Sequence, residues 1–220
     1  MKTGTQLIFG IGAALICAGL SYLLEQSFIR KRKLEKKAGR ALHMAVYAFL
    51  ILSGVLFLMA GSTAAEAVYF FLLLTLIGAA TLMDGAYRII PNDIVLALIG
   101  LKLLYGGLKL LGVPGVAEFR FLPALAGFGA CFIIFLLPAF RGRNIGAGDV
   151  KLAAAMGFCL GLKNSLTAVV LMGLAVLGYM MVKSRLPLMK TVKSTIPMAP
   201  FLGAGMIIST LLSQSGLTVF

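Results

Sequence analysis

The stretch Asn144-Ile-Gly-Ala-Gly-Asp-Val-Lys151 places an aspartate directly after two glycines and directly before a long apolar run. A second aspartate, Asp84, ends an earlier apolar run and is followed by Arg88-Ile-Ile-Pro-Asn92. The chain has only seven acidic residues. Two of them at the edges of hydrophobic segments indicate a function, because ionisable groups are costly at membrane depth.

The composition around these aspartates is that of a membrane protein. Of 220 residues, 60% are hydrophobic and only 12% are charged. Apolar runs of roughly 20 residues match a hydrocarbon core about 30 Å thick. We therefore expect an all-α, polytopic transmembrane bundle that forms one membrane-embedded domain over residues 1–220. The expected membrane segments are Gln6–Leu24, Leu42–Ala60, Ala64–Met83, Ile94–Leu111, Phe121–Phe140, Val150–Leu162, Leu166–Val182 and Pro197–Leu212.

The sixth of these eight segments is too short to cross the bilayer comfortably. Its residues rise only about 20 Å at roughly 1.5 Å each. Either the bilayer thins around it or the segment begins inside the membrane. In the second case, Asp149 would lie in a recess below the membrane surface.

Basic residues predict the orientation, because Lys and Arg concentrate in short cytoplasmic loops. Counting alternate connectors places fifteen of the twenty Lys and Arg residues on one side, including the short connector 26–41. The same count puts Asp84 and Asp149 together at the cytoplasmic face and both termini outside. The net charge of +13 then reflects membrane sorting. We expect no nucleic-acid partner, and we expect Arg30–Arg40 to contact anionic lipid head groups.

The other reactive side chains offer little support for a metal, a disulfide or a catalytic triad. Cys17, Cys131 and Cys159 lie inside apolar segments without C-x-x-C spacing, which is typical of small hydrophobic residues. His43, the single histidine, stands beside the basic connector, where an interfacial position is expected. We predict no metal site and no cofactor.

Paired aspartates remain as candidate catalytic groups. Two carboxyl groups a few ångströms apart tend to share one proton, so that one activates water while the other polarises a carbonyl. Other roles stay open from the residues alone. Asp149 could cap a helix, either aspartate could pair with Arg88 or Lys151, and a proton- or cation-coupled transporter could use the same acids.

Three blocks of sequence together resemble the type IV prepilin peptidases, which are membrane aspartic proteases of the G-x-G-D class. Gly146-Ala-Gly-Asp-Val-Lys151 is similar to their signature, and Asp84 with Tyr87-Arg-Ile-Ile-Pro-Asn92 is similar to their first aspartate motif. Ile196-Pro-Met-Ala-Pro-Phe-Leu-Gly203 resembles their closing segment. The blocks occur in the family's order over most of residues 75–205.

The resemblance implies removal of the basic leader from prepilins or pseudopilins, at the cytoplasmic face of a bacterial inner membrane. It implies that Asp84 and Asp149 are the catalytic pair. The supporting motif positions that it implies are Gly146, Gly148, Lys151, Pro91, Asn92, Pro197 and Pro200. Many members also carry a cysteine-rich domain associated with zinc and N-methylation, after the first membrane segment. Only the connector 26–41 occupies that place here, so we expect a short form without methyltransferase activity.

Overall fold

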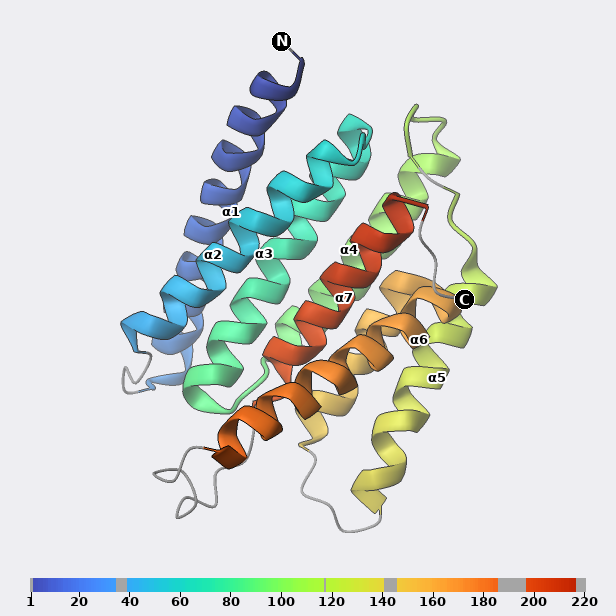
Figure 1. Ribbon diagram of the computed structural model, residues 1–220. Helices are drawn as coiled ribbons and strands as arrows, with labels where there is room; N and C mark the ends of the chain where they lie inside the picture. Colours follow the sequence, from blue (N-terminus) through green and yellow to red (C-terminus); the bar gives the residue numbers. More distant parts are fainter. Residues whose placement is uncertain (1, 35–38, 117, 141–145, 186–196, 217–220) are drawn as a thin grey trace.

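The computed structural model describes residues 2–34, 39–116, 118–140, 146–185 and 197–216. Within these ranges the chain forms seven α-helices and no strand, which confirms the predicted helical bundle (Figure 1). The helices are α1 (Lys2–Arg32), α2 (Arg40–Met59), α3 (Ala64–Tyr87), α4 (Asn92–Leu110), α5 (Phe121–Phe140), α6 (Ala147–Arg185) and α7 (Ala199–Gln214). Figure 1 shows α1, α2 and α3 on one flank, α5 and α6 on the other, and α4 with α7 between them.

Helix α6 joins two of the segments that the sequence predicts separately. Its helical path is interrupted at Gly161, whose φ of 74° and ψ of 173° are accessible essentially only to glycine. The part before this break, residues 147–160, rises only about 21 Å, so it is still short for a bilayer. Five helices in the described residues (α1, α2, α3, α5 and α6) are long and apolar enough to cross a membrane. The count of eight segments stays a prediction.

Helix α3 supplies the centre of the bundle. Its residues from Phe70 to Asp84 are almost all buried, and it packs against α1, α2, α4 and α7. Helix α6 packs against α4, α5 and α7. At the crossing of α5 and α6, Gly127 and Gly157 leave no room for a side chain between the two backbones. Small residues of this kind allow membrane helices to approach closely.

Polar contacts at one end of the bundle join segments that are distant in sequence. Lys31 Nζ lies 3.0 Å from Asp93 Oδ2 and links the end of α1 to the start of α4. Lys151 Nζ donates to Asn92 Oδ1 over 3.4 Å and links the start of α6 to α4. The basic end of α1 and the starts of α4 and α6 are therefore at the same end of the molecule. Some of the basic residues counted for the cytoplasmic side lie outside the described residues, among them Arg141, Arg143, Lys190 and Lys193.

Lys102 lies inside the bundle, about 15 Å along α4 from Asn92 by helical rise. Its Nζ is 5.6 Å from the Tyr69 ring centroid and 5.9 Å from that of Phe119. Both separations suit a cation–π contact. The Lys102 ammonium group is therefore in contact with aromatic rings inside the bundle.

Candidate active site

Asp84 lies in the last turn of α3 and is only 6% exposed. The helix ends at Arg88, which adopts a left-handed conformation (φ 56°, ψ 33°) while its N–H donates to the Asp84 carbonyl over 3.0 Å. The Asp84 side chain in turn accepts a hydrogen bond from the Ala199 N–H, 2.9 Å from Oδ2. A buried carboxyl group thus has a backbone donor from the start of α7.

Asp149 is the third residue of α6 and is partly buried. Its backbone N–H donates to the Gly146 carbonyl over 3.0 Å, and its carboxylate lies beside Gly146 at the start of the helix. This is the position at which a carboxylate stabilises the start of a helix. Asp149 is thus the third residue of the helix and not its N-cap, which was the role that the sequence left open. Its carboxylate faces a cavity.

The two aspartates face the same cavity, which has a volume of about 300 Å³. It is lined by Asp84, Arg88, Ile89, Ile90, Gly146, Ala147, Gly148 and Asp149. The carboxyl groups are close enough to interact electrostatically. No hydrogen bond joins them directly, and no Cα atom of α3 comes within 8 Å of one of α6.

The two helices that carry the aspartates do not pack directly on each other. The segment Ile89–Ile90 and the starts of α4 and α7 stand between α3 and α6, because α3 packs on α4 and α7 but not on α6. The carboxylates therefore face each other across a polar space. A space of 300 Å³ admits water and a peptide group, since one water occupies about 30 Å³.

Two residues of the first motif fix the conformation of the segment Ile89–Ile90, which lines the cavity. Pro91 is the residue before α4, with φ at −64°, and it is buried. Its ring fixes this turn and disfavours helical backbone at Ile90, so α3 cannot continue into α4. Asn92 opens α4 and accepts the hydrogen bond from Lys151. The first and second motifs are thus in direct contact.

The glycines of the second motif allow the start of α6 to pack tightly. A Cβ added at Gly148 would lie 3.2 Å from the Ile90 Cβ. One added at Gly146 would lie 3.2 Å from Asp149 Oδ2. Side chains at these positions would therefore displace either the Ile89–Ile90 segment or the carboxylate itself.

The third motif forms the start of α7. Pro200 occupies the first turn of the helix, where the absence of its N–H costs nothing. Pro197 precedes the helix. N–H groups in a first helical turn have no partner within their own helix, and that of Ala199 is used for Asp84. All three motifs thus converge on one carboxyl group or its surroundings.

Ion pairing does not account for either aspartate. Within the described part of the chain, the side chains of Arg88 and Lys151 make no ion pair with Asp84 or Asp149 at 4.0 Å or less. Arg88 lines the cavity and acts on both carboxyl groups through its charge. Lys151 is exposed and directed to Asn92.

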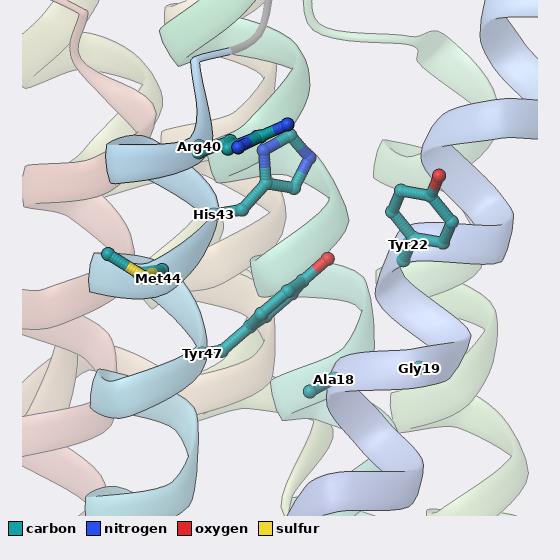
Figure 2. Close-up of a pocket in the computed structure, with 7 residues that line it drawn as sticks. All are labelled: Ala18, Gly19, Tyr22, Arg40, His43, Met44 and Tyr47. Carbon is teal, nitrogen blue, oxygen red and sulfur yellow. The ribbon is translucent and has the colours of Figure 1, made fainter.

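A second polar cluster, which the sequence analysis missed, lies between α1 and α2. Glu25 is fully buried, and its Oε2 is 2.8 Å from His43 Nε2. Figure 2 shows His43 between Tyr22 and Tyr47, with Arg40 at the same end of a cavity of about 780 Å³. His43 is therefore held by a buried carboxylate instead of simply facing the membrane interface. The signal was an acidic residue just before the basic connector and a histidine just after it.

One comparison with known proteins finds a family whose model matches the part of the chain that holds the first two motifs. The family model for the type IV leader peptidase family matches residues 68–181, which include Asp84 and Asp149. No curated protein and no solved structure matches the chain. Since the family model covers just over half of the chain, this multi-pass helical protein belongs to the type IV leader peptidase family.

Proposed function

We propose that the chain is an aspartic endopeptidase in which Asp84 and Asp149 are the catalytic pair. The observation that carries this proposal is the single cavity of about 300 Å³ that both carboxyl groups line, at the meeting point of the three motifs. Membership of the type IV leader peptidase family supports a protease activity. The aspartic mechanism is the chemistry that this pair of side chains supports best.

In the proposed reaction a water molecule lies between the two carboxyl groups with the scissile peptide. The ionised carboxylate removes a proton from the water, and the protonated partner donates to the peptide carbonyl oxygen as the tetrahedral intermediate forms. Proton transfer to the leaving nitrogen then releases the new amino terminus. The gap between the carboxyl groups is compatible with this sequence, because catalytic contacts often tighten only when substrate is bound.

The proposed substrates are type IV prepilins or pseudopilins, cut after a short basic leader at the cytoplasmic face of the inner membrane. Asp84 and Asp149 lie at the same end of the bundle as Lys31, and basic residues mark the cytoplasmic side.

Coexpression with a prepilin tests the proposal. Wild-type protein should shorten the prepilin, while Asp84→Ala and Asp149→Ala should each leave it uncut. Asp93→Ala is the matched control, because Asp93 lies at the same end of the bundle but pairs with Lys31 outside the cavity. Unchanged processing by either cavity variant would reject the site. An uncut prepilin together with aspartate-dependent proton uptake into vesicles would favour a transporter.

We further propose that the chain does not methylate the cleaved product. Its three cysteines are separate, buried and free, and the connector between α1 and α2 is short. Purified protein should therefore transfer no methyl group from S-adenosylmethionine to a cleaved pilin. Measurable transfer would overturn this part of the proposal.

Anionic lipid is the other proposed partner. Arg40 lines the cavity between α1 and α2, where the apolar residues Ala18 and Met44 continue toward the middle of the helices (Figure 2). A lipid phosphate beside Arg40, with its chain on the apolar part, would fit this gradient. Protein purified in native lipid should carry more phosphatidylglycerol than an Arg40→Gln variant.

A further inference from the structure

An apolar groove runs along the bundle beside Asp84, with a volume of about 340 Å³. It is bounded by α2, α3, the second part of α6, and α7. The residues on which the argument depends are Ala45, Ile77, Thr81, Ala175, Pro200 and Gly203. Most of the lining residues are hydrophobic or small, whereas two carboxyl groups and Arg88 line the cavity described above.

The groove leads to Asp84 along two helices. On α3, Ile77 and Thr81 line the groove, and Asp84 follows them at the spacing i, i+4, i+7 that marks one helical face. On α7, Pro200 and Gly203 line it, directly after the Ala199 N–H that binds Asp84. Asp84 therefore lies between the apolar groove and the cavity that it shares with Asp149.

Resting on the proposed function, we propose that this groove binds the apolar helical segment of the substrate, on the chain just beyond the scissile bond. A substrate that spans the bilayer and is cut at its surface has residues in hydrocarbon on one side of the cut. Such residues must be apolar and helical, because their backbone polar groups find no water there. The order of polarity along the enzyme, a polar cavity and then an apolar groove, matches a charged leader followed by an apolar helix.

The shape of the groove also fits a helix. Its volume is far too small for a whole helix, so the occupant inserts side chains from one face and keeps the remainder against lipid. Ala45 on α2 and Ala175 on α6 are both exposed at its rim. Small residues at such positions let a second helix approach closely, which is how membrane helices associate without a hydrophobic driving force.

Tryptophan substitutions at the rim test the groove without touching the aspartates. Ala45→Trp and Ala175→Trp should fill it from two different helices. Ala48→Trp is the matched control, since Ala48 is an exposed alanine of α2 that does not line the groove. We expect kcat/KM for a full-length prepilin to fall about tenfold or more in both groove variants, mainly through KM, because uniform binding is lost. The Ala48→Trp enzyme should stay within about twofold of wild type, as surface substitutions usually do.

A photo-crosslinking experiment separates failure of the groove from failure of the proposed activity. p-Benzoylphenylalanine replaces Phe49, which lines the groove, or Phe132 of α5, which does not. In the Asp149→Asn background, the probe at position 49 should crosslink to the apolar segment of the same prepilin, and the probe at 132 should not.

The combined outcomes are decisive for both ideas. Crosslinks at position 49 without any processing by wild type would support the groove and reject the peptidase site. Normal processing by both groove variants, with equal crosslinking at 49 and 132, would reject the groove and leave the peptidase site intact. Crosslinking of position 49 to lipid alone would also overturn the groove, because its occupant would then be an acyl chain.

Discussion

The N–H of Ala199 donates a hydrogen bond to Asp84 Oδ2 over 2.9 Å, across 115 positions of sequence. Ala199 is itself only 1% exposed, so neither partner can turn to bulk water instead. The bond ties the closing Pro-rich motif to the first aspartate. It gives the start of α7 a defined place in the site and gives Asp84 a role in folding beside its proposed role in catalysis.

The first prediction separates these two roles. Asp84→Asn keeps an oxygen that can accept from Ala199, whereas Asp84→Leu removes the acceptor and leaves a buried N–H unpaired. We expect both variants to lose peptidase activity. Only Asp84→Leu should lose stability, by about 1–3 kcal/mol, the usual cost of an unsatisfied buried group. Thermal unfolding in one detergent measures the difference, and equal stabilities would contradict the importance of this bond.

The second prediction concerns the way in which the two aspartates act together. If they form one catalytic unit, removing the second should cost little after the first is gone. We expect Asp84→Asn and Asp149→Asn each to reduce the single-turnover rate by at least about a thousandfold, and the double variant to be no slower by more than about threefold. Fully multiplicative losses would indicate two independent contributions and would reject the pair.

A third prediction rests on the close approach of Gly148 to Ile90. Gly148→Val would push against the Ile90 Cβ, which a Cβ at position 148 would meet at 3.2 Å, and would shift the segment between the carboxyl groups. Prepilin processing should fall about a hundredfold, because displacements near 1 Å cost that much at a reacting centre. The second-site change Ile90→Gly, which removes the contacted Cβ, should restore much of it.

Gly173→Val is the control for the same chemical change. Gly173 lies in the same helix, and a Cβ there would meet nothing within 4 Å. Its processing rate should stay near that of wild type. If both valine variants lose activity equally, the loss arises from valine within the helix and not from the contact with Ile90.

The sequence predicted the features that depend on composition and charge, but not those that depend on which helices pack together. Asp84 and Asp149 could be singled out because acidic residues are rare in an apolar chain, and the basic connectors predicted that they share one end. What separates them could not be predicted. The placement of Ile89–Ile90 and α7 between α3 and α6 depends on which helices pack together, and apolar periodicity carries no such information in a bundle that is hydrophobic on most faces.

Glu25 was missed for a related reason. At the end of the first apolar run and just before Arg30–Arg40, it has the setting of an interfacial residue. Its burial arises from the way in which α1 and α2 pair across the connector, which brings His43 onto it. The break in α6 was close to prediction, because the sequence separated two segments near Gly161, where the structure interrupts the helix.

The fourth prediction uses the backbone at Gly161. Its conformation (φ 74°, ψ 173°) is strained for any residue with a Cβ, so Gly161→Ala should destabilise the protein by about 1–3 kcal/mol. Gly129→Ala should have the opposite sign, a gain of roughly 0.5–1 kcal/mol, because Gly129 lies within α5 and a Cβ there meets nothing within 4 Å. Thermal unfolding of the two variants checks this, and a stabilised Gly161→Ala protein would show that the break in α6 is not required.

The fifth prediction concerns the buried pair of Glu25 and His43. The Nδ1 atom of His43 lies 3.3 Å from the Gly39 carbonyl oxygen. Its Nε2 atom lies 2.8 Å from Glu25 Oε2, and Glu25 is fully buried. Breaking this pair should therefore be costly. We expect Glu25→Ala to destabilise the protein by about 3–5 kcal/mol, since it leaves a mostly buried histidine unpaired.

Two further variants serve as controls for the Glu25→Ala prediction. Disrupting the exposed pair of Lys31 and Asp93 with Asp93→Ala should cost less than about 1 kcal/mol, because solvent screens it. Replacing both buried partners in Glu25→Leu/His43→Leu should recover most of the loss, since apolar substitutes remove the need for pairing. A Glu25→Ala protein as stable as Asp93→Ala, measured by thermal unfolding in the same detergent, would mean that the carboxylate of Glu25 does not hold α1 against α2.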